Sequence, residues 1–215
     1  MNLSLPFNTR KRLGQTGSPG LDDDQSLYVQ PRHGGSWYDL ANRGQMFQGN
    51  IAAAGVVLPL VTNTTQQVGL WNPAGNDVDA VLRSISLTYV STTGAAGGFV
   101  IGYLANAPAQ LATGAAITAF TETTAINCKL NAPVASKVKF AQGATITVTA
   151  PSILRSTGIN QLVITAADAT NTQWTSRIEF DGDLIVTPGS AIFVAGNIAT
   201  LITMAGTVVW AEIPR

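Results

Sequence analysis

Charged side chains are scarce in this sequence: Asp, Glu, Lys and Arg make up 11% of the 215 residues, with 12 basic and 12 acidic side chains. Ordinary soluble domains carry about 25%. A surface with so little charge, and no net charge, does not repel copies of itself. Zero net charge also argues against general nucleic-acid binding, which needs a basic footprint. We therefore expect a surface largely covered by copies of the chain or by another protein.

Cysteine and histidine are nearly absent as well. The single Cys128 excludes an intramolecular disulfide and argues against a cysteine-based metal site. The only histidine, His33, is followed by Gly34-Gly35, whereas a catalytic base must be held rigidly within hydrogen-bond reach. The glycine-rich loop 94–98 lacks the Lys and the helix start of a phosphate-binding loop. We expect no enzymatic activity, no cofactor and no metal.

Neither a secretory signal nor a membrane helix is indicated. The first 15 residues lack the apolar core of a signal peptide. The charge-free run Ile192–Ala211 has the length of a membrane span. However, Gly196-Asn197 and Ala205-Gly206 interrupt it at turn-like points, and β-branched residues dominate between them. Two buried strands joined by turns explain the run, so we expect no membrane insertion.

Alternation of apolar and polar residues is the main signal that is present. In Arg177–Pro188, Ile178 and Phe180 fall on one face and Arg177 and Glu179 on the other, which predicts a long half-buried strand. Pro188-Gly189 then turns the chain into a second apolar run, Ala191–Val194. This hairpin is typical of a two-layer β protein.

The same stretch carries the acidic residues that come closest to a cation site. Glu179, Asp181 and Asp183 would share one strand face, and calcium takes several oxygen ligands. Residues at i and i+2 lie about 6.6–6.8 Å apart, too far for a cage without loop ligands. Alternatively, an Asp181-Gly182 turn would split the strand and abolish the common face.

Apolar runs of strand length recur after residue 45, separated by turn residues. They are Gln45–Ala53, Val56–Val61, Val68–Trp71, Val78–Val90, Phe99–Leu104, a hairpin of Lys137–Phe140 with Ala144–Ala150, Ile159–Thr165 and Val208–Ile213. No long helix and no repeat of 30–40 residues accompanies them. The pattern predicts an all-β fold, a jelly-roll-like antiparallel β-sandwich over residues 46–215.

Residues 1–45 have a different character. Turn-forming residues cluster there, and no apolar periodicity is sustained, which is typical of an extended N-terminal arm. Basic residues and the acidic run 22–24 lie close together, so a protein contact is favoured over a phosphate contact. The aromatic pair at its end would serve as an anchor. The predicted partner-binding residues are Arg10, Lys11, Arg12, Trp37 and Tyr38.

Three stretches resemble small structural proteins of tailed-phage virions, of the jelly-roll decoration and head-fibre type. They are WNPAGNDVDAVLRSISLTYVSTTGAAGG, DGDLIVTPGSAIFVAGN and the terminal VVWAEIPR. The resemblance implies a sandwich displayed on the particle surface, often as a homotrimer, with the arm gripping the major capsid protein. It implies no catalytic residues.

Two other functions stay open at this point. A tail or fibre-tip module that binds a host receptor or glycan would expose aromatic residues on its loops, such as Trp71 or Trp174. A carbohydrate-active enzyme would need a pair of carboxylates in a cleft, and nothing in the sequence selects such a pair.

Overall fold

The computed structural model describes residues 20–21, 27–28, 36–91, 98–104, 117–149, 151–157, 175–180, 182–197 and 202–215. The chain divides into two compact units, Met1–Asp39 and Leu40–Arg215. In the first unit, β1 (Gly20–Leu21) pairs antiparallel with β2 (Leu27–Tyr28). The unit boundary falls inside the short helix α1 (Ser36–Asn42), whereas the sequence placed the end of the arm at residue 45.

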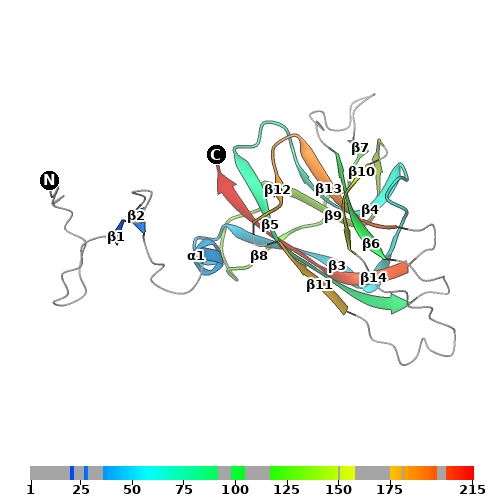
Figure 1. Cartoon of the computed structure of the whole chain (residues 1–215), viewed down its shortest axis with the longest axis horizontal. Helices are drawn as coiled ribbons and strands as arrows, with labels where there is room; N and C mark the ends of the chain where they lie inside the picture. Colours follow the sequence, from blue (N-terminus) through cyan, green and yellow to red (C-terminus); the bar gives the residue numbers. More distant parts are fainter. Residues whose placement is uncertain are drawn as a thin grey trace. The chain divides into compact units, whose positions relative to one another are not determined.

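The second unit is a sandwich of two antiparallel sheets, drawn as two layers in Figure 1. Sheet I has the order β11-β5-β14-β3-β8, and β12 also pairs with β5. Its strands are β3 (Met46–Leu58), β5 (Val78–Ser91), β8 (Ile126–Asn127), β11 (Thr175–Glu179), β12 (Ile185–Val186) and β14 (Ile202–Pro214). Sheet II has the order β10-β6-β13-β4-β9-β7. Its strands are β4 (Thr65–Asn72), β6 (Phe99–Leu104), β7 (Ile117–Ala119), β9 (Lys139–Val148), β10 (Ser152–Thr157) and β13 (Ser190–Gly196).

The strand order is that of a jelly roll. Without the short and inserted strands, sheet I reads β3-β14-β5-β11 and sheet II reads β4-β13-β6-β10. The first of these strands in the chain therefore pairs with the last, and the second with the last but one, as in two nested Greek keys. The predicted jelly-roll-like antiparallel β-sandwich is confirmed. The insertion between β6 and β10 adds β8 beside β3, β9 beside β4 and β7 beside β9.

An aromatic stack fills the core between the sheets. Trp210 of β14 lies between Phe47 of β3 and Phe140 of β9, with ring centroids 6.2 Å apart in both pairs and interplanar angles of 26°. All three side chains are buried. Gly49 lies directly against Phe140, because a Cβ atom at position 49 would stand 2.4 Å from that ring. The absence of a side chain there lets β3 and β9 approach across the sandwich.

Several predicted turns are bulges within continuous strands. The runs Gln45–Ala53 and Val56–Val61 join into β3, which shifts register against β14 where Met204 pairs with Val56 and Gly206 with Ile51. The hairpin predicted around Gln142-Gly143 is wrong, because β9 runs through it with a register shift against β4. A bulge accommodates turn-forming residues without reversing the chain.

The long strand predicted over Arg177–Pro188 is also wrong. β11 ends at Glu179, the Asp183 amide donates to the Phe180 carbonyl over 2.8 Å, and β12 begins only at Ile185. Gly182 has a φ of 97°, which favours glycine. The alternative of a turn near Asp181-Gly182 is therefore confirmed, although Asp181 itself lies outside the described residues.

The charge-free run Ile192–Ala211 forms parts of two strands, as expected. β13 ends at Gly196 and β14 begins at Ile202. β14 continues through Ala205-Gly206, which the sequence marked as a turn. Within the described part of the chain, no helix has the length and apolarity needed to cross a membrane. The predicted strand Ile159–Thr165 lies outside the described residues.

Candidate functional site

The predicted partner-binding residues are only partly described. Arg10, Lys11 and Arg12 lie outside the described residues. Trp37 and Tyr38 lie in the first turn of α1, where Tyr38 is 52% exposed and Trp37 is half-buried. Their role in binding a partner stays a prediction.

The end of α1 is tightly capped. The Gln45 amide donates to the Leu40 carbonyl and the Gly44 amide to the Ala41 carbonyl, both over 2.9 Å. This pair of bonds, with Gly44 at a φ of 72°, is a Schellman motif. Lys129 Nζ donates to the Asn42 carbonyl over 2.7 Å. A positive charge therefore lies at the carboxyl end of the helix, where it interacts favourably with the helix dipole.

The residues that hold this cap belong to an edge loop, which we define as residues 126–134, including β8. Asn127 Nδ2 donates to the Gly44 carbonyl over 2.8 Å and to the Val134 carbonyl over 3.3 Å. Asn127 Oδ1 accepts from the Lys129 amide over 2.9 Å. The Cys128 amide donates to the Met46 carbonyl over 2.9 Å. One buried amide side chain thus fixes both the loop and the start of the sandwich.

The edge loop presents apolar side chains to solvent. Leu130 is 79% exposed, Val134 51% and Ile126 43%. Fully burying a side chain of this kind is worth about 1.5–3 kcal/mol, so leaving three of them in water in one loop is a cost that a partner surface would remove.

A second apolar feature is an edge groove between β10, β6, β12 and β13. It is lined chiefly by Tyr103, Leu104, Leu154, Leu184, Ile185 and Ile192, and none of its lining residues is charged. Ile185 is 51% exposed, and Ile153 on the neighbouring edge strand is 56% exposed. Arg155 of β10 contacts the segment between β11 and β12. Its guanidinium forms an ion pair with Asp183 over 2.8 Å and lies 5.1 Å from the centroid of the Phe180 ring.

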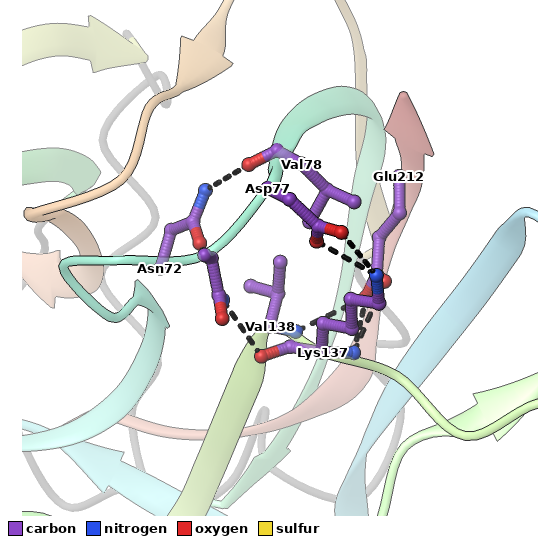
Figure 2. A network of polar contacts seen from close by, with 7 residues as sticks. Asn72, Asp77, Val78, Lys137, Val138 and Glu212 are labelled. Carbon is purple, nitrogen blue, oxygen red and sulfur yellow. Dashed lines mark hydrogen bonds and ion pairs between the residues drawn. The ribbon is translucent and has the colours of Figure 1, made fainter. Parts of the chain in front are cut away.

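A network of polar contacts around Glu212 connects the two sheets (Figure 2). The buried carboxylate of Glu212 on β14 accepts from the amides of Lys137, at 3.1 and 3.0 Å, and Val138, at 3.2 Å. Ser136 Oγ lies 2.5 Å from Glu212 Oε1 and 2.6 Å from the Val138 carbonyl, and its single proton can serve only one of them at a time. Lys137 Nζ pairs with Asp77 over 2.7 Å on the exposed side. These contacts tie the segment that leads into β9 to the other sheet.

Asn72 extends the network between β4, β5 and β12. Its Nδ2 donates to the carbonyls of Val78 and Val186, both over 2.9 Å, and its Oδ1 accepts from Asn76 over 2.8 Å. Both polar groups of the Asn72 side chain have protein partners, so we interpret this residue as a structural contact between strands and not as part of a ligand site.

Of the acidic residues considered for a cation, Glu179 and Asp183 are held in separate ion pairs, and Asp181 lies outside the described residues. Glu179 pairs with Arg83 over 3.2 Å and with Arg177, whereas Asp183 pairs with Arg155. Among the residues that the structure describes, no three His, Cys, Asp or Glu side chains gather where they could hold a metal ion. Burial raises the pKa of the Cys128 thiol above its ordinary value, which disfavours the nucleophilic thiolate.

The fibre-tip alternative expected an exposed aromatic at Trp71. This residue is instead fully buried, packed against Phe120 with ring centroids 5.5 Å apart. Trp174 lies outside the described residues. A search of protein families, of curated proteins and of solved structures finds no match for this chain.

Sequence reasoning missed both apolar edges. The edge loop falls in a stretch that showed only weak alternation, and an apolar residue in a sequence is ordinarily assigned to the core. The run of uncharged residues 130–136 after Lys129 was the available signal, since it is too short and irregular to form a strand.

Proposed function

We propose that this chain is a non-enzymatic structural protein of a phage virion, a capsid decoration, cement or head-fibre subunit on the particle surface. It binds the major capsid protein through its N-terminal arm and associates with copies of itself. The observation that carries the proposal is a jelly roll that exposes large apolar side chains at both lateral edges, on the edge loop and beside the edge groove.

Three features support it. Jelly rolls occur in capsid proteins and in lectins, which is an argument by analogy of fold. The chain has few charged residues and no net charge, which suits a subunit that lies against other proteins. Several exposed apolar side chains lie on the edge loop or line the edge groove, which favours contact with a protein surface over a small-molecule site built from convergent polar groups.

The location is tested by quantitative mass spectrometry of purified particles together with labelling by an antibody raised against the chain. A decoration subunit is expected at hundreds of copies per particle, labelled over the head. Copies in the tens at the tail tip would support the receptor- or glycan-binding alternative. Absence from particles would refute both.

The role of the arm is tested with the full-length chain. Arg10→Ala, Lys11→Ala and Arg12→Ala combined should abolish binding to particles stripped of the protein, while the melting temperature of the sandwich stays unchanged. Arg177→Ala on the exposed strand β11 is the matched control, and it should bind as the unaltered chain does. Full-occupancy binding by the triple variant would refute the role of the basic cluster.

A further inference from the structure

β14 is the strand that joins the two halves of sheet I (Figure 1). It pairs antiparallel with β3 on one side and with β5 on the other, in each case along most of its length. Among the strands that the structure describes, no other strand pairs with both β3 and β5. Without β14, β3 would keep only its short pairing with β8, and the backbone groups of β3 and β5 that face β14 would lose their hydrogen-bond partners.

The side chains of β14 also complete the core. Met204, Val208 and Trp210 are buried between the sheets. Trp210 lies at the centre of the aromatic stack, and the Glu212 carboxylate accepts hydrogen bonds from the segment that leads into β9. The loss of all these contacts together would exceed the marginal stability of a domain, so the other strands alone do not suffice to hold the sandwich.

The slot, which we define as the space between β3 and β5 that β14 occupies, fits the sequence of β14 in one register. A Cβ atom at position 206 would clash with the Ser86 carbonyl oxygen, so Gly206 is the residue that fits there. β14 also shifts register against β3 between Met204 and Gly206. A slip by one residue would bring a side chain against Ser86 and turn Trp210 away from the core.

β3 and β5 come early in the chain, and β14 is the last strand of the sandwich. We propose that the sandwich forms only when β14 enters the slot, and that the slot is a binding site for residues 202–215 supplied as a separate peptide. Until then, β3 and β5 each have an unpaired edge, and such edges promote aggregation. The inference concerns how the domain is completed, and it does not rest on the proposed function.

The test uses the full-length chain with a protease recognition sequence inserted between residues 199 and 200. After cleavage, the two pieces should stay together in size-exclusion chromatography in native buffer. Because folding of the cut chain is then an association, free peptide 202–215 should raise its melting temperature by about 3–6 °C for each tenfold increase in peptide concentration. The uncut chain with the same insertion is the control. Its melting temperature should not change, since its tethered strand fills the slot.

Variant peptides test the fit to the slot. Trp210→Ala should require about 100-fold more peptide for the same rise in melting temperature, and Gly206→Ala about tenfold more. Thr207→Ser is the matched control, because it keeps the hydroxyl that lies near Asn50 Oδ1 at an exposed position, and it should act as the native peptide does. The proposal is overturned if the cut pieces separate in native buffer, if the melting temperature of the cut chain does not respond to the peptide, or if the Trp210→Ala and Gly206→Ala peptides act as the native one does.

Discussion

The Glu212 carboxylate makes the sharpest prediction about stability. It is 5% exposed, and it accepts hydrogen bonds from the Lys137 and Val138 amides and from Trp210 Nε1, the last over 3.4 Å. In Glu212→Gln, one oxygen becomes an NH₂ group. Whichever way the amide is turned, that group faces a backbone N–H, because both carboxylate oxygens are acceptors in the native structure.

The expected loss follows from the kind of bond removed. A hydrogen bond to a charged group contributes about 1.5–3 kcal/mol, and the new amide also leaves a buried donor without an acceptor. In a domain of this size, 1 kcal/mol corresponds to about 2–4 °C in melting temperature. Glu212→Gln should therefore melt about 3–12 °C lower, and the amides of Lys137 and Val138 should exchange with deuterium faster than in the native chain.

Asp77→Asn is the matched control within the same network. It removes the partner of Lys137 Nζ, but the Asp77 side chain is 73% exposed, so solvent already screens the pair. Its melting temperature should fall much less than that of Glu212→Gln. If Glu212→Gln melts at the native temperature and both amides keep their protection, the carboxylate does not hold the sheets together and the reasoning fails.

Three further predictions concern other parts of the sandwich. Gly49→Ala should cost about 1–3 kcal/mol in denaturant unfolding, because its methyl group would displace the Phe140 ring; an unchanged midpoint would contradict the close packing. The Lys137 ammonium lowers the pKa of Asp77 below its ordinary value, so this pair stabilises the fold above about pH 4 and ceases to do so as the pH falls through the lowered pKa. Comparing urea midpoints of the native chain and Asp77→Asn across that range checks the sign. Lys129→Met should speed amide exchange at the Schellman cap of α1, and unchanged exchange would mean that the cap needs no cation.

The local sequence pattern predicted the strands whose apolar residues stand out between turn-forming residues. Phe99–Leu104 has the same bounds as β6, and Val78–Val90 matches β5 to within one residue. β10 was missed because Ser152–Thr157 does not alternate. Its conformation depends on pairing with β6, with a register shift between Ile153 and Arg155. Pairing between distant segments, such as β3 with β14, cannot be inferred from either segment alone.

The candidate surfaces were less predictable than the fold. Whether Leu130 or Leu87 is exposed depends on the insertion between β6 and β10, which carries the first to an edge, whereas the second faces the opposite sheet. Asn127 and Glu212 look like ordinary polar residues in the sequence. Their importance comes from the backbone groups that the fold brings to them.

The edge loop is held at both ends, and this links stability to assembly. Asn127 fixes its start, and Glu212 fixes residues 136–138 just after its end. A loop that is already ordered loses less conformational entropy when a second copy of the chain covers it, so releasing one end should weaken the proposed self-association. Glu212→Gln should therefore assemble less well than the native chain at temperatures far below its melting point. Leu87→Ala, a core truncation expected to cost about 2–5 kcal/mol away from the loop, should assemble normally when folded. If sedimentation velocity finds both variants equally impaired, general destabilisation explains the effect, and the ordering of the loop does not contribute to assembly.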